Sequence, residues 1–347
     1  ATAFCAATRD FGSVTRGFVL GLALAVAATL WGAGAGLAAP TQALLFSGGL
    51  WLTALLVGRR VLLTFPAAVP TLGEPARRIW ASAREHPCVV WGALAAIGAI
   101  WVDSWIMWFG PAGLAVANGL PTAPFYDSAM FVARLSMLPG LVLFLSSVDT
   151  GVFLAVRRFL DAAGGHASLA RIEALAERLG AEIDRLLLRL ILVQAAFAAI
   201  AVAMAPALVE PAGLLYGQLG ILRLGALAAL FHVVFFAATT LLLLLGRERS
   251  FLAAQLGFLA LNALGTLATL ALGESAYGFG YLAAATLAAA GATVMVQRAQ
   301  RDVVFLTFAG ALAQSRRRPP APLFPFASRL RARLGAARRA NPEESRR

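Results

Sequence analysis

The chain has 347 residues, of which 60% are hydrophobic and 13% are charged, and its formal net charge is +12. A soluble globular protein of this size is much less apolar, so the composition excludes that class and indicates a polytopic membrane protein. All 29 basic residues are arginine. The absence of lysine excludes a P-loop and a Schiff-base site, since both chemistries need a lysine amine.

Eight stretches are long and apolar enough to form transmembrane helices. A spanning helix needs about 20 mostly apolar residues, because the hydrocarbon core is about 30 Å thick and each residue rises about 1.5 Å. The predicted spans are residues 17–39, 41–58, 88–109, 127–149, 187–208, 219–245, 251–272 and 278–296. The sequence therefore predicts an all-α polytopic membrane protein with eight transmembrane helices.

The arginines predict the orientation of these spans, because positively charged loops remain in the cytoplasm. The N-terminal segment and alternate connections carry two, five, six and two arginines, where the six include Arg189 at the start of the fifth span. The segment after the last span carries twelve, and the intervening connections carry none. Both termini are therefore predicted to be cytoplasmic. In a bacterial inner membrane the arginine-free loops would face the periplasm.

Two features precede the third span. The first span contains the run Gly32-Ala33-Gly34-Ala35-Gly36, which lies inside an apolar stretch and therefore predicts close helix packing instead of a dinucleotide loop. Residues 59–86 are rich in arginine and proline, and we expect them to form a cytoplasmic linker between two helical lobes.

The third and fourth spans each carry a charged residue at similar depth. Asp103 and Arg134 lie about six and seven residues from the same membrane face, so antiparallel helices would bring them together as an ion pair. Trp101, Trp105 and Trp108 form a stripe on the opposite face of the third span from Asp103. The tryptophans are expected to meet lipid, and Asp103 to point into the bundle.

Asp127 and Arg134 are seven residues apart and hence on one face of the fourth span. Either the charged residues lock two helices together or they line a solute path, and the sequence leaves both open. Pro139 lacks a backbone N–H, so it predicts a kink in the middle of this span. Such a kink is a place where a gate can bend.

Residues 168–190 place leucine and isoleucine at helical spacing among charged residues. This pattern predicts an amphipathic cytoplasmic helix that lies near the membrane surface and runs into the fifth span. It would serve either as a packed helix or as a partner site.

Polar side chains in the sixth and seventh spans are expected to join helices. Gln255 and Asn262 share one stripe with two threonines, a pattern typical of packing. Arg223 and His232 fall on opposite faces of the sixth span. A His232 bonded to a neighbouring helix is favoured over one that carries protons.

The candidate residues divide into two groups, and none is expected to be catalytic. The candidates for the transport path or its gating are Asp103, Asp127, Arg134, Pro139 and Arg223, and the secondary polar candidates are His232, Gln255 and Asn262. The histidines lack metal-ligand spacing, so neither a metal site nor a cofactor is predicted.

The tail contributes most of the net charge. Ten arginines and two glutamates follow residue 314, so the tail supplies +8 of the +12. Residues 301–347 are expected to form a mostly disordered cytoplasmic arm that contacts anionic lipids, and no nucleic-acid partner is expected.

Several segments with unusual polar residues resemble the PelG family. The segments are Trp101–Pro111, Phe125–Phe131, Leu135–Gly140, Ser147–Thr150, Ile221–Arg223, Leu261–Leu264, Tyr277–Gly280 and Phe305–Phe308. The resemblance covers roughly residues 50–308. The family comprises inner-membrane transporters of the Pel exopolysaccharide, within the multidrug/oligosaccharidyl-lipid/polysaccharide (MOP) flippase superfamily.

The resemblance implies a MOP/MATE-like architecture of twelve spans in two six-helix lobes. The eight spans here would be the last eight, in an N-terminally truncated chain. Residues 1–58 would then be the remnant of the first lobe, residues 59–86 the inter-lobe linker, and residues 87–300 a complete second lobe.

The resemblance also implies a function. A PelG-like chain would export a growing, amino-sugar-rich polysaccharide during formation of the biofilm matrix. The polymer would come from a PelF-like cytoplasmic glycosyltransferase, and PelD- and PelE-like membrane proteins would be partners. The alternatives are a lipid-linked oligosaccharide flippase, a multidrug exporter, or a membrane-embedded transferase, for which Asp127 beside Tyr126 is the best available pair.

Overall fold

The computed structural model describes residues 11–64, 73–115, 121–165 and 167–309. The chain divides into two compact units, residues 1–84 and 85–347. Eight helices in the described part are long and apolar enough to cross a membrane. The prediction of an all-α polytopic membrane protein with eight transmembrane helices is therefore confirmed.

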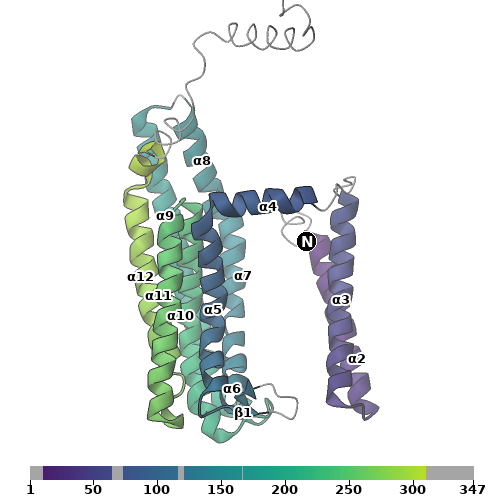
Figure 1. Cartoon of the computed structure of the whole chain (residues 1–347). Coiled ribbons are helices and arrows are strands. Elements are labelled where there is room, and N and C mark those ends of the chain that lie inside the picture. The colour runs from purple at the N-terminus through teal and green to yellow at the C-terminus, as the bar shows by residue number, and fades with distance from the viewer. Residues whose placement is uncertain (1–10, 65–72, 116–120, 166, 310–347) are drawn as a thin grey trace, which may run out of the picture. The chain divides into compact units, whose positions relative to one another are not determined.

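The first unit is built on an antiparallel pair of helices, α2 (Phe11–Gly34) and α3 (Ala39–Thr64), drawn in purple in Figure 1. The two helices approach closely where small residues meet. A Cβ placed on Gly49 would lie 2.5 Å from the backbone of Ala25. Small residues of this kind allow helices to pack in lipid, where burial of apolar surface gives little driving force.

The run Gly32–Gly36 lies at the C-terminal end of α2. The prediction that it packs closely against another helix holds only for Gly32. Gly36 has a φ of 68°, its N–H bonds the Ala33 carbonyl, and the Leu37 N–H bonds the Gly32 carbonyl. This is the Schellman arrangement that terminates helices at a glycine with positive φ. A Cβ on Gly32 would lie 2.9 Å from Leu45 of α3, whereas one on Gly34 would meet nothing.

The segment expected to be a linker contains a helix, α4 (Gly73–Glu85). Its described side chains are mostly exposed, and the Arg84 guanidinium lies over the Trp80 ring at 5.5 Å. Its apolar and charged residues recur at the spacing of a helix. The sequence analysis did not predict this helix, because the prolines of the segment suggested a linker.

The second unit is a bundle of helices (Figure 1), and α10 is the most buried of its long helices. Its other long helices are α5, α9, α11 and α12, and a further candidate span, Leu138–Gly164, covers α7 and α8 and follows the shorter α6. Their bounds are α5 (Pro87–Phe109), α6 (Pro124–Leu135), α7 (Leu138–Ser147), α8 (Phe153–Gly164), α9 (Leu169–Val209), α10 (Leu219–Leu244), α11 (Glu248–Leu272) and α12 (Phe279–Arg301). A short antiparallel pair, β1 (Leu114–Ala115) and β2 (Pro121–Thr122), follows α5.

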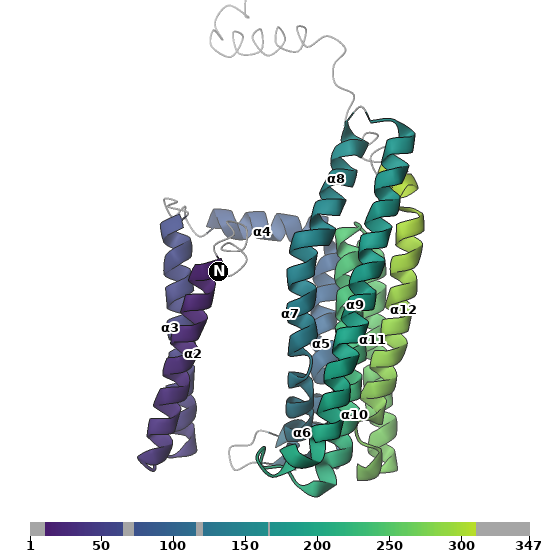
Figure 2. The same ribbon diagram turned by 180° about the vertical axis from the view of Figure 1, so that it is seen from behind.

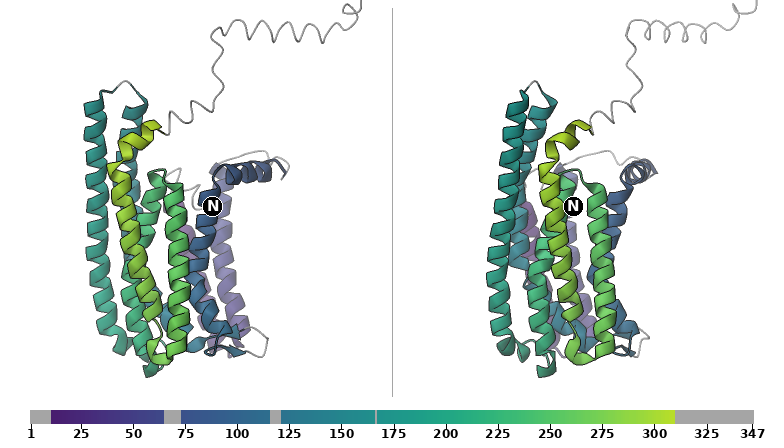
Figure 3. Two further views of the ribbon diagram at one scale, coloured as in Figure 1. Left: turned by 60° about the vertical axis from the view of Figure 1, so that its left-hand side comes forward. Right: turned by 90° about the vertical axis from the view of Figure 1, so that its left-hand side faces the viewer.

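The bundle packs through small residues on facing helices. The buried face of α12 is mainly alanine, and α10 and α11 both lie against this helix, as Figure 3 shows from two sides. At the crossing of α11 and α12, a Cβ on Gly265 would lie 2.9 Å from the Gly280 carbonyl oxygen. The two backbones are in contact at this point. Any residue larger than glycine would hold the helices further apart.

The fourth predicted span is broken where the proline predicted a kink. α6 ends at Leu135, Ser136 and Met137 form a turn, and α7 begins at Leu138 with Pro139 in its first turn. A π-helical turn, Val148–Val152, then joins α7 to α8. The predicted end of this span at residue 149 was too early, because helix continues to Gly164.

The segment 168–190 is helical and runs into the fifth span, as predicted. It is the first half of α9, which runs without a break for 41 residues, or about 61 Å. α8 packs against this half. In Figures 1 and 2 the joined ends of α8 and α9 extend beyond the neighbouring ends of α10 and α11.

Candidate functional site

The predicted ion pair between α5 and α6 is present. Arg134 Nη2 donates a hydrogen bond of 2.6 Å to Asp103 Oδ2, and Asp103 is completely buried. Asp103 lies six residues before the end of α5, and Arg134 lies ten residues after the start of α6. The charges of the two side chains compensate each other in a region where an isolated charge would be costly.

Two tyrosines and a histidine extend this pair to four helices. The Tyr126 hydroxyl donates to the same Asp103 oxygen at 2.8 Å. The Arg134 guanidinium lies over the ring of Tyr281 on α12 at 5.3 Å. The Tyr281 hydroxyl shares a hydrogen bond of 2.5 Å with Nδ1 of His232 on α10. We call Asp103, Tyr126, Arg134, His232 and Tyr281 the polar cluster.

Three buried polar atoms at this end of the bundle have no hydrogen-bond partner in the part of the chain that the structure describes. They are Asp103 Oδ1, Asp127 Oδ1 and Arg134 Nε. Buried polar atoms in proteins are nearly always bonded, so such a concentration marks a site with unused hydrogen-bonding capacity.

Asp127 bonds to Trp108 and to the start of its own helix. Trp108 Nε1 donates to Asp127 Oδ2 at 2.5 Å, and the backbone N–H of Ala123 donates to the same oxygen at 3.3 Å. The negative charge lies in the first turn of α6, where the helix dipole favours it. Asp127 therefore forms no ion pair with Arg134, although the two residues lie on one face of the predicted span.

The three tryptophans of the predicted stripe differ in their exposure, although the sequence placed all of them on one face of α5. Trp101 and Trp105 are 46% and 42% exposed. Trp108 is instead half-buried, because its ring N–H bonds Asp127. Trp108 is therefore less exposed than the other two members of the predicted stripe.

An apolar hollow lies beside Trp108, at the end of α5. It has a volume of about 570 Å³ and is lined by Trp105, Trp108, Phe109, Pro121 and Thr122. Three of these five side chains are aromatic, so the hollow offers flat apolar faces next to the half-buried carboxylate of Asp127. The sequence analysis did not identify it, because it depends on how β2 folds back against α5.

A comparison with protein families decides what kind of protein carries this site. The family model described as "PelG: Putative exopolysaccharide Exporter (EPS-E)" matches residues 1–308. The chain belongs to the PelG family. The predicted resemblance is thus confirmed, and it extends to the first two helices. No curated protein and no solved structure matches the chain in similar comparisons.

In this PelG-family chain, the break between α6 and α7 is bridged by a residue that the sequence analysis missed. Gln194 of α9 is fully buried, its Nε2 donates to the Ser136 carbonyl at 2.7 Å, and its Oε1 accepts from the Gly140 N–H at 3.1 Å. The amide thus satisfies backbone groups on both sides of the break that Pro139 accompanies. Its signal was available, since Gln194 is the single polar side chain between residues 190 and 209.

The secondary polar candidates tie the PelG-family bundle together, in agreement with the packing interpretation. Asn262 Nδ2 donates to the Ala99 carbonyl of α5 at 2.9 Å, and Gln255 Nε2 donates to the Thr239 hydroxyl of α10 at 3.2 Å. His232 is bonded to a neighbouring helix, as favoured. Arg223 is exposed near the start of α10, on the face opposite His232, and does not join the polar cluster.

Proposed function

We propose that the chain transports a growing, amino-sugar-rich exopolysaccharide across the inner membrane of a bacterium during export of the biofilm matrix. The observation that carries this proposal is the PelG match over residues 1–308 in a chain with eight candidate membrane spans. Export of a hydrated polymer needs a path between helices with groups that bind sugars weakly.

The hollow at the end of α5 supports this proposal chemically. Sugar rings have an apolar face of C–H groups and an edge of hydroxyls, which match an aromatic surface beside hydrogen-bonding groups. Trp105, Trp108 and Phe109 supply the aromatic surface, and Asp127 lies behind Trp108. We infer that this hollow contacts the polymer and that the polar cluster holds the adjacent helix ends in place.

The same proposal includes the partners and the orientation. Both termini would be cytoplasmic, where a PelF-like glycosyltransferase supplies the polymer and PelD- and PelE-like membrane proteins assemble with the chain. The arginine-rich tail, which lies outside the described residues, would contact anionic lipids.

The test is export of the polymer by cells that carry single substitutions at the hollow. Trp105→Ala and Trp108→Ala should reduce secreted polymer about tenfold at an equal amount of membrane-inserted protein. Trp108→Phe keeps the ring face but loses the N–H that bonds Asp127, so it separates stacking from positioning. The matched control is Trp91→Ala, an exposed tryptophan near the other end of α5.

Export should also fall when Asp103 or Arg134 is replaced by alanine while the protein still inserts. Wild-type export with both residues replaced would overturn the assignment of the polar cluster. Purified protein that moves a lipid-linked oligosaccharide in liposomes, without any effect of the tryptophan substitutions on polymer export, would favour the flippase alternative.

A further inference from the structure

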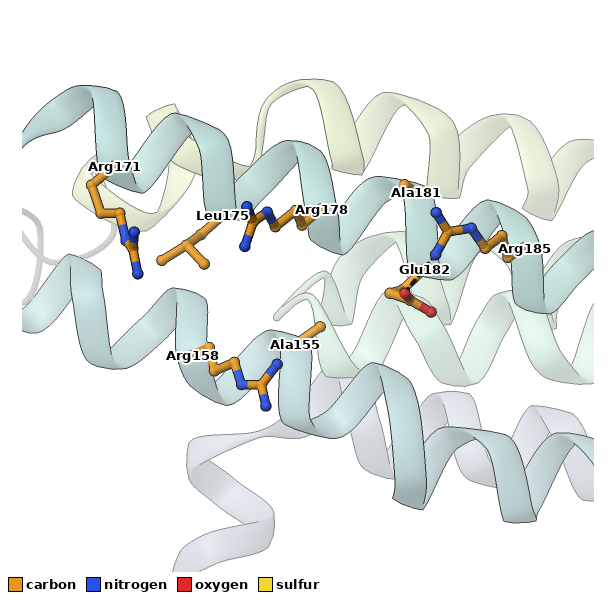
Figure 4. Close-up of a pocket in the computed structure, with 8 residues that line it drawn as sticks. All are labelled: Ala155, Arg158, Arg171, Leu175, Arg178, Ala181, Glu182 and Arg185. Atoms are coloured by element: carbon orange, nitrogen blue, oxygen red, sulfur yellow. Dashed lines mark hydrogen bonds and ion pairs between the residues drawn. The ribbon is translucent and has the colours of Figure 1, made fainter.

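A basic groove lies between α8 and α9. Its volume is about 490 Å³. It is lined by Ala155 and Arg158 of α8 and by Arg171, Leu175, Arg178, Ala181, Glu182 and Arg185 of α9. Figure 4 shows Arg171 and Leu175 directed from α9 toward α8, and Arg158 lying along α8.

The charge of the groove is not balanced by its own lining. Glu182 is the single acidic residue among the eight that line it, and it bonds Arg185 at 2.8 Å. Arg158, Arg171 and Arg178 form no ion pair within the described residues. Orientation in the membrane needs positive charge at this end, but it does not require arginines from two helices to meet around one hollow.

The spacing of the arginines indicates an extended ligand. Arg171, Arg178 and Arg185 follow one another at seven residues on one face of α9, so they are about 10.5 Å apart and span about 21 Å. One phosphate group, free or on a lipid, cannot reach both ends of this row. A helix with carboxylates at the same spacing can pair with Arg171 and Arg178 and reach toward Arg185, which already bonds Glu182.

Two further features of α9 favour an acidic, partly apolar ligand. Ser168 caps α9 by accepting the Arg171 N–H, and the first turn of α9 contains no acidic residue, so the positive end of the helix dipole faces the same region. Leu175, half-buried between Arg171 and Arg178, offers an apolar contact between the charges.

We propose that this groove docks an acidic α-helical segment of a partner protein, with Asp or Glu at seven-residue spacing opposite the arginines and an apolar residue against Leu175. The surface lies away from the aromatic hollow, so the proposal goes beyond polymer contact and does not rest on it.

The test is site-specific photocrosslinking in living cells. Ala181 is exposed and lines the groove, so it is replaced by benzoylphenylalanine in the full chain, and the crosslinked peptide is identified by mass spectrometry. The expected product is a protein segment with carboxylates seven residues apart. Its yield should fall at least tenfold in Arg171→Gln/Arg178→Gln.

The matched control is Arg298→Gln/Arg301→Gln on α12, which removes the same charge outside the groove and should leave the yield unchanged. Charge exchange makes the test specific: Arg171→Glu/Arg178→Glu should lose the product, and arginines in place of the two carboxylates of the identified segment should restore it. Equal midpoints of thermal unfolding for these variants exclude misfolding.

Three outcomes would overturn the proposal. The first is crosslinking to lipid alone or to no protein. The second is a protein segment without paired carboxylates, or one whose yield ignores the arginine pair. The third is loss of the product on addition of pyrophosphate at millimolar concentration but not on addition of sodium chloride of equal ionic strength, which would indicate a compact phosphate site instead.

Discussion

The polar cluster shows which single-residue features the sequence could predict. Asp103 and Arg134 were paired from their depths alone, because consecutive antiparallel helices bring equal depths together. Tyr281 and His232 could not be added, since their contacts depend on α12 lying beside α10 and near α6. Residue spacing along one helix fixes a face but does not show which helix that face meets.

The ion pair predicts a characteristic result in a double-mutant cycle. Asp103→Asn leaves Arg134 charged in a buried setting, and loss of one partner of such a pair costs about 3–5 kcal/mol in free energy of unfolding. Asp103→Asn/Arg134→Gln should cost less than the sum of the two single substitutions. Unfolding by SDS in mixed micelles measures these values, and additivity within about 0.5 kcal/mol would contradict the pair.

Gln194 predicts a second effect at the residue scale. Gln194→Leu removes the hydrogen bonds to Ser136 and Gly140 and should lower the free energy of unfolding by roughly 1–3 kcal/mol, because each bond contributes about 0.5–1.5 kcal/mol. Gln300→Leu is the control, since that side chain makes an exposed contact to Asp184. Equal effects of the two substitutions on the unfolding midpoint would refute the role of Gln194.

Helices were predicted well by hydropathy, but their ends and interruptions depend on local chemistry. Gly36 ends α2 through its positive φ, and Gly246 ends α10 in the same way, with a φ of 71°. The continuity of α9 was predicted, although its first half is amphipathic and its second half is apolar. A change of surroundings along one helix changes its composition without changing its backbone.

The crossing of α11 and α12 predicts a difference between two glycines of one helix. A Cβ on Gly280 would overlap the backbone of Gly265, whereas one on Gly291 would meet nothing within 4 Å. Gly280→Ala should therefore destabilise the bundle by about 1–3 kcal/mol, the usual cost of overpacking. Gly291→Ala should be neutral or stabilising by up to about 1 kcal/mol, as alanine favours helix. Thermal unfolding in detergent compares the two, and an equal loss would show that the crossing tolerates a side chain.

At the scale of the whole molecule, the distribution of arginine predicts the orientation of every connection. Ser168, between α8 and α9, and Ser275, between α11 and α12, are exposed and lie on opposite sides in this scheme. After the two cysteines of the chain, Cys5 and Cys88, are replaced by serine, a membrane-impermeant maleimide applied to spheroplasts should label Ser275→Cys and not Ser168→Cys. Lysed cells should label both, and the reverse pattern in spheroplasts would invert the topology.

The division of the chain into two units was only partly accessible from the sequence. The boundary at residue 84 falls at the end of the segment 59–86, where prolines and arginines interrupt the apolar spans. Helix α4 inside that segment was not foreseen, since thirteen residues bounded by proline give a weak signal. The aromatic hollow was likewise unpredictable, because it needs the fold of β2 against α5.

Because α9 is one unbroken helix, a movement of one end along the helix axis displaces the other end with it. Arg171 near one end and Gln194 within the bundle are 23 residues, or about 34 Å, apart on one rigid element without a proline between them. A sliding of α9 by a single residue rise, about 1.5 Å, exceeds the range of a hydrogen-bond length and would pull Gln194 off both Ser136 and Gly140. A force applied to the exposed end of the α8–α9 hairpin would thus break the two hydrogen bonds by which Gln194 bridges the break between α6 and α7.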